Sequence, residues 1–130
     1  MSSIPKTVQT LPIDIEAEKR VLGILIKYPQ EIDYIIERLR PEHFYYPEHR
    51  KIYEVILNLY TQAGRISYTQ IYSELRKSKA FANPAQVLMG LTESIVAISE
   101  LQPSVELILY KAGLRRILEA AHTIESMVAK

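Results

Sequence analysis

The stretch from Pro47 to Gly64 constrains the fold of this chain more than any other. Proline suits the first position of a helix because its missing N–H would have no partner there, and glycine suits the position just past the end. The sequence therefore predicts a helix over residues 47–63. Apolar residues occupy most of its circumference: Ile52, Tyr53, Val55, Ile56, Leu57, Leu59 and Tyr60. Such a helix must be surrounded, so we expect it to be the central buried helix.

Start and stop signals predict two helices before this one. Asp14 can cap the first, and Glu16 and Glu18 in its first turn favour the positive end of the helix dipole. Pro29 ends that helix and opens a second, which we expect to cover residues 29–39. Its buried side is predicted from apolar residues at helical spacing: Ile32, Ile35, Ile36 and Leu39.

The segments after Gly64 also read as helical. Ser67 and Gln70 form a capping box, which predicts a helix over residues 67–79. Pro84 opens another helix that includes Leu88 and Leu91, and residues 92–102 are expected to form a packed loop or a broken helix.

The fold class that follows is all-α, because no segment alternates with the two-residue period of a strand. We expect a compact multi-helix bundle around one central helix, followed by a long C-terminal helix. The corresponding division is a flexible tail over residues 1–12, a globular bundle over 13–100 and the long helix over 101–130.

That last helix, which we expect to begin near Pro103, has a pattern of its own. Its apolar residues recur at alternating steps of three and four: Leu107, Tyr110, Leu114, Ile117, Ala121, Ile124 and Val128. This is a heptad seam, and a narrow seam packs against another helix. The seam is therefore predicted to be an oligomer interface, unless the helix folds back on the globular part.

Composition and spacing exclude several classes of function. The four glycines stand far apart, without the GxxxxGK[ST] pattern of a phosphate-binding loop, so no nucleotide cofactor is expected. The chain has no cysteine, and His43, His49 and His122 are too scattered to suggest a metal site, so we read them as solvated or capping residues. We predict no catalytic residues. The net charge of +1 gives no basic excess for binding phosphates, and no stretch is long and apolar enough to span a membrane.

One alternative remains from another class of protein. The central helix, the turn after Gly64 and the helix over 67–79 can be read as a helix-turn-helix, with Arg76, Lys77 and Lys79 on phosphates. However, these cations lie at the C-terminal end of the second helix, where the dipole favours them anyway, and recognition helices read bases from their N-terminal residues.

Four segments together resemble one known family. They are LPIDIEAEKRVLGILI at 11–26, HFYYPEHRKIY at 43–53, GRI at 64–66 and GLRRILEAA at 113–121. In order and spacing they are similar to the N-terminal domain of the bacterial replicative DNA helicase DnaB. Ser67 stands where that family usually has Asp, which marks a divergent member.

The resemblance implies an assembly role. In that family a globular helical bundle is followed by an antiparallel helical hairpin, two domains pair through their hairpins, and three pairs form a ring collar on which primase docks. ATP hydrolysis and DNA translocation belong to a separate RecA-like domain, which is absent from these residues, and the hairpin is expected to be cut after its first helix.

We therefore expect a non-catalytic assembly and primase-docking domain of a replicative helicase. Its expected partners are further copies of itself, as a dimer or a hexameric collar, then DNA primase and a helicase loader, with no direct binding of nucleic acid or membrane. The expected location is the cytoplasm, associated with the nucleoid. The alternatives are a stand-alone helical DNA-binding protein and a helicase loader or adaptor that shares the module.

Candidate docking residues lie beside the seam. Arg115 and Arg116 are consecutive, so they point about 100° apart, and both lie off the seam next to Leu118. An apolar residue beside guanidinium groups suits an acidic partner, since the leucine contributes burial and the arginines set orientation. The predicted docking set is Arg115, Arg116, Leu118 and Glu16.

Overall fold

The computed structural model describes residues 11–93 and 97–129, and over these residues the protein is helical with no strand. The all-α prediction is therefore confirmed. The described residues form five α-helices and three short 3-10 helices, in this order: α2 (Ile15–Lys27), η1 (Pro29–Tyr34), η2 (Pro41–His43), α3 (Pro47–Ala63), α4 (Tyr68–Arg76), α5 (Pro84–Glu93), η3 (Ile98–Glu100) and α6 (Leu101–Val128).

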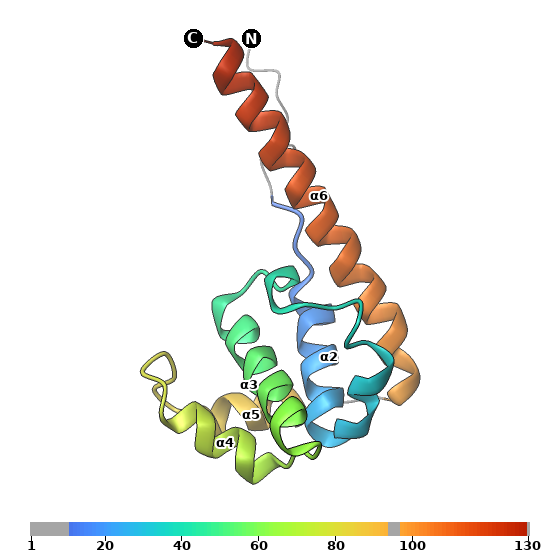
Figure 1. Cartoon of the computed structure of the whole chain (residues 1–130), viewed down its shortest axis with the longest axis vertical. Coiled ribbons are helices and arrows are strands. Elements are labelled where there is room, and N and C mark those ends of the chain that lie inside the picture. The colour runs from blue at the N-terminus through green and yellow to red at the C-terminus, as the bar shows by residue number, and fades with distance from the viewer. Residues whose placement is uncertain (1–10, 94–96, 130) are drawn as a thin grey trace.

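The central helix of the bundle is α2, whereas the sequence led us to expect α3. Helix α2 packs against α6, α5, η1 and α3 (Figure 1). Eight of its 13 residues are buried. Only five of the 17 residues of α3 are buried, because Leu57, Leu59 and Tyr60 lie half-exposed at the edge of the core. The apolar residues around most of the circumference of α3 therefore led us to overestimate how much of this helix is buried. Tyrosine in particular can keep its hydroxyl at the surface, as Tyr60 does by donating to Asp33.

The predicted helix caps are confirmed. Asp14 accepts a hydrogen bond from the N–H of Ala17 at 2.9 Å. Gly64 ends α3 with φ of 66°, a left-handed conformation that favours glycine. Ser67 and Gln70 form the reciprocal capping box of α4. That helix ends at Arg76, three residues before the predicted end.

The segment after Pro29 is not the α-helix that we expected. It forms η1 and then a turn, although Ile32, Ile35 and Leu39 are buried as predicted. The apolar spacing does not distinguish the two structures, because Ile32 and Ile35 are three residues apart and a 3-10 turn places them on the same side as an α-helix does.

Helix α6 begins at Leu101 instead of near Pro103, and its two halves have different environments. Its first half packs against α2 through buried residues: Leu101, Ser104, Val105, Ile108 and Ala112. Polar contacts support this packing, since Arg20 Nε donates to Ser104 Oγ at 3.0 Å and Arg38 contacts Glu106 at 2.6 Å. Beyond Ala112 no described residue of α6 is buried, and the helix projects from the bundle (Figure 1). We call residues 113–128 the arm and the rest of the described chain the head.

Candidate partner interface

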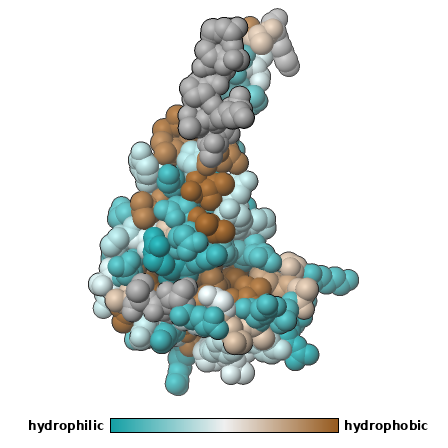
Figure 2. All heavy atoms as spheres, turned by 180° about the vertical axis from the view of Figure 1, so that it is seen from behind, coloured by the Kyte–Doolittle hydropathy of each residue, from teal (hydrophilic) through white to brown (hydrophobic). Residues whose placement is uncertain are grey.

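The predicted seam lies on the exposed side of α6. Within the seam Tyr110, Ile117, Ile124 and Val128 have exposed fractions of 62, 65, 61 and 79%. Apolar side chains follow the projecting helix upward from the head in Figure 2. Leu107 is 38% exposed and Leu114 half-buried. The seam therefore does not fold back onto the head along the arm. A face of this kind is suited to contact with another helix.

Beneath the arm, on a flank that shares Ala121 with the seam, lies a groove of about 1080 Å³ between α6 and the head. It is open to solvent and mixed in character, with apolar, basic and acidic side chains. Its lining includes Leu11, His43, Tyr45, Arg115, Arg116 and Leu118. Three of the four predicted docking residues thus line one groove.

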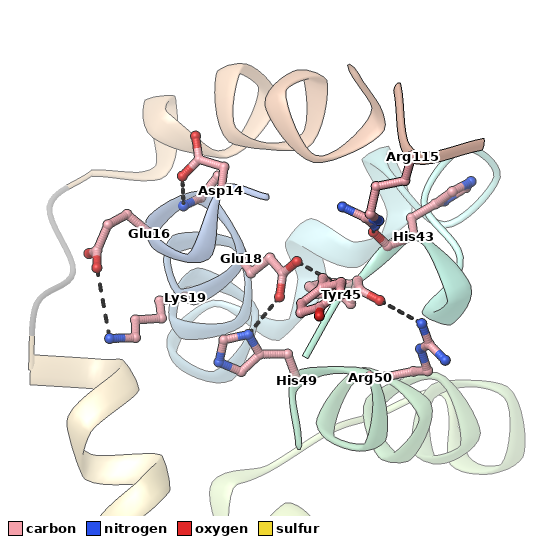
Figure 3. Close-up of polar contacts among 11 residues, drawn as sticks. Asp14, Glu16, Glu18, Lys19, His43, Tyr45, His49, Arg50 and Arg115 are labelled. Atoms are coloured by element: carbon pink, nitrogen blue, oxygen red, sulfur yellow. Dashed lines mark hydrogen bonds and ion pairs between the residues drawn. The ribbon is translucent and has the colours of Figure 1, made fainter. Parts of the chain in front are cut away.

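The fourth, Glu16, lies elsewhere. It is exposed in the first turn of α2, and its carboxylate lies 3.8 Å from Lys19 Nζ. Figure 3 shows this pair on the side of α2 away from Arg115. The structure therefore does not bring Glu16 together with the other candidate docking residues.

Arg115 is bound by its own chain. Its guanidinium donates to the carbonyl oxygens of Pro12 and His43, both at 2.8 Å, and lies 5.5 Å from the centre of the Tyr45 ring (Figure 3). Planar, bidentate donation of this kind is what distinguishes arginine from lysine. Arg116 and Leu118 are exposed, so both are available to a partner.

A buried polar network lies behind the groove, and the sequence analysis missed it. Glu18 is 1% exposed and His49 is 8% exposed, and Glu18 Oε1 lies 2.7 Å from His49 Nδ1. The other carboxylate oxygen accepts the backbone N–H of Tyr45 at 2.7 Å (Figure 3). The carboxylate thus connects α2, α3 and the segment that precedes α3.

The sequence led us to assign Glu18 to the helix dipole and to read His49 as a solvated or capping residue. Glu18 does lie in the first turn of α2, but it is buried against His49, which is itself buried instead of solvated. A signal was present in the sequence. Glu18 stands four residues before Leu22 and seven before Leu25, so it shares the apolar face of α2. His49 stands in the same relation to Tyr53 and Ile56 on α3. Polar residues on two apolar faces suggest a buried pair.

His43 sits where the head meets the arm. Its Nδ1 accepts the N–H of Arg40 at 2.9 Å, while its carbonyl accepts from Arg115. Burial lowers the pKa of the imidazole below its usual 6.5, and the positive charges of Arg116, Arg40 and Arg115 lower it further, while Glu42 opposes them. The neutral form of His43 is therefore the one that the fold stabilises.

Two of the three cations of the alternative helix-turn-helix reading have local partners. Arg76 lies 5.8 Å from the centre of the Tyr72 ring, and Lys77 is 3.0 Å from Glu74. Across residues 11–93 and 97–129 no three His, Asp or Glu side chains are placed to hold a metal ion, and no helix is long and apolar enough to cross a membrane.

A helical head that carries a projecting helix with an exposed apolar face defines a class of protein: an all-α domain with one extended helix. Comparison with known proteins gives the family. Residues 10–110 match the DnaB-like helicase N terminal domain, and the chain belongs to this family.

The relatives agree with this assignment. The chain is 29% identical over 121 residues to the replicative DNA helicase DnaB of Leifsonia xyli, covering 92% of this chain and 26% of that protein. It is 28% identical to the replicative DNA helicase DnaC of Bacillus subtilis, covering 87% of this chain and 25% of that protein. The chain therefore spans about a quarter of the length of these relatives.

A solved structure matches the fold as well. The crystal structure of the N-terminal domain of DnaB helicase from Mycobacterium tuberculosis superposes with a TM-score of 0.85 at 28% identity. The match covers 93% of this chain and 89% of that one. The corresponding region of the helicase is thus its N-terminal domain, which is distinct from the motor.

Removal of the buried carboxylate should strongly destabilise the fold. Glu18→Ala leaves His49 and the N–H of Tyr45 without their partner, and breaking a buried pair of this kind costs about 3–5 kcal/mol. Glu16→Ala on the same helix is the matched control, expected to cost under about 1 kcal/mol because that carboxylate is exposed. Urea unfolding of both variants measures the difference. Equal losses of stability in the two variants would show that the buried carboxylate of Glu18 stabilises the fold no more than the exposed carboxylate of Glu16.

The lowered pKa of His43 predicts a pH dependence of stability. The unfolded chain binds a proton on this side chain more readily than the folded one, so unfolding gains protons as the solution is acidified. The stability that the neutral His43 side chain contributes to the folded state is complete above pH 6.5. It is lost as pH falls through the lower pKa that this side chain has in the folded state. His43→Asn keeps an acceptor near the Nδ1 position without titrating there. Its stability should therefore fall less than that of the wild type between neutral and mildly acidic pH in thermal unfolding.

Proposed function

We propose that this chain is the assembly and docking domain of a replicative DNA helicase. It joins copies of itself through the exposed seam of α6 and binds DNA primase at the groove beneath the arm. The unwinding activity named for its relatives is not assigned to these residues, which correspond to a quarter of those proteins.

The observation that carries self-association is the exposed seam. Four of its side chains are more than half exposed on a helix that leaves the head, and the family membership gives the context. Exposed apolar side chains in a row are costly in water unless they are covered, and the heptad spacing suits a helix from a second copy.

The docking proposal rests on the composition of the groove. Arg116 is exposed on its rim and Leu118 is 37% exposed beside it. Together they offer one apolar contact and one guanidinium group to an acidic partner surface. The groove lies on the flank of α6 next to the seam and shares Ala121 with it, while Arg116 lies off the seam.

Two substitutions on the arm test self-association. Ile117→Glu with Ile124→Glu places charges on the most exposed part of the seam and spares Leu114, which is half-buried. Each isoleucine contributes roughly 1.5–3 kcal/mol when buried, so the dimer dissociation constant should rise at least about 100-fold. Light scattering over a concentration series gives that constant. Ala120→Glu with Thr123→Glu adds the same charge off the seam and should leave the assembly intact. An unchanged oligomer in the Ile117/Ile124 variant would place the interface elsewhere.

A titration with the cognate primase tests docking. Arg116→Glu with Leu118→Ala removes both available groove contacts and should weaken binding at least about tenfold, which corresponds to about 1.4 kcal/mol. Helicity and oligomeric state should not change, because both side chains are exposed. Glu16→Lys reverses a charge outside the groove and should bind primase like the wild type. If only Glu16→Lys loses affinity for primase, the docking surface lies on the side of α2 that carries Glu16.

A further inference from the structure

We propose that Arg115 is a positioning residue that fixes the direction of the arm relative to the head. The inference concerns the conformation of a single chain, so it holds or fails independently of the proposed self-association and docking.

Arg115 lies where α6 leaves the head. Ala112, at 5% exposure, is the last buried residue of the helix. Arg115 follows it by three residues and is half-buried, whereas every described residue from Arg116 to the end of the helix is exposed. Among the described residues, Arg115 is therefore the last side chain of α6 that is partly buried, and it contacts the head.

Its contacts reach two separate parts of the chain. One hydrogen bond goes to the carbonyl of Pro12, which leads into α2, and the other to the carbonyl of His43 at the end of η2. Hydrogen bonds from charged donors are stronger than those between neutral groups, and the aromatic face of Tyr45 adds a cation–π contact. The guanidinium contacts two carbonyl oxygens and one aromatic ring of the head, so motion of the arm in any of several directions would stretch at least one of these contacts.

The acceptors are themselves held rigidly. Tyr45 is fixed through its N–H by the buried carboxylate of Glu18. The carbonyl of His43 belongs to a short 3-10 turn in which the His43 ring accepts the N–H of Arg40. We call the contacts of Arg115 with Pro12, His43 and Tyr45 the clamp. The clamp thus joins the arm to the polar network of the head.

Fixing the arm fixes the orientation of the seam. Ile117, Ile124 and Val128 project beyond Arg115 on the same rigid helix, so a small rotation at the head displaces them further toward the tip. A surface that must meet an identical copy with defined geometry requires such a constraint. Loss of the clamp should therefore widen the range of arm directions without altering the seam itself.

Pulsed electron paramagnetic resonance within one chain tests this proposal. The chain has no cysteine, so Gln62→Cys on α3 and Thr123→Cys on the arm accept spin labels at two defined and exposed positions. Dilution with unlabelled protein restricts the measurement to distances within a chain. We expect a narrow distance distribution in the labelled wild type, and a broadened or shifted one after Arg115→Ala.

Arg116→Ala is the matched control, since it removes a neighbouring guanidinium that is exposed. Its distance distribution should coincide with that of the wild type, while Arg115→Lys should fall between the wild type and Arg115→Ala because an ammonium cannot reproduce the planar fork. If Arg115→Ala does not fold, Arg115→Gln, too short to reach both carbonyls, is measured in its place. A distribution unchanged from the wild type in the folded Arg115 variant would overturn the proposal, and so would equal broadening in Arg116→Ala.

Discussion

The buried carboxylate of Glu18 is the interaction on which the organisation of this domain depends. Ionised carboxylates are rarely buried without partners, and here one oxygen meets His49 while the other accepts the N–H of Tyr45. The apolar core would hold α2 against its neighbours in several registers, since hydrophobic contact is not directional. Two short polar contacts to different segments select one of them. The same carboxylate that completes the core therefore sets the segment on which Arg115 rests, and through it the arm.

This arrangement separates two surfaces on one helix. The first half of α6 belongs to the head through its packing on α2, and the arm extends the helix into solvent with its apolar seam and the groove on adjacent faces. A continuous helix transmits orientation along its length because every turn is hydrogen-bonded to the next. Contacts made near Ala112 and Arg115 are thus able to determine where the seam is presented.

Much of the fold could be predicted from the sequence, because caps and prolines act locally. Asp14, Pro47, Gly64 and Ser67 each satisfy or omit backbone hydrogen bonds within one turn, and the helix boundaries followed from them. The centrality of α2 could not be read in this way, because burial depends on which helices pack together. The same holds for the interface. The seam was visible as a periodic pattern, whereas the contacts of Arg115 with Pro12 and His43 join residues 103 and 72 positions apart, beyond any local rule.

Amide hydrogen exchange at Tyr45 tests this account most directly. Outside a regular helix, this N–H is protected only by its bond to the buried carboxylate of Glu18. The account predicts that the Tyr45 amide exchanges as slowly as the core amides of α2, and that Glu18→Gln accelerates it selectively, since a neutral amide is a weaker acceptor than a carboxylate. Rapid exchange at Tyr45 in the wild type, or protection unaltered by Glu18→Gln, would contradict it.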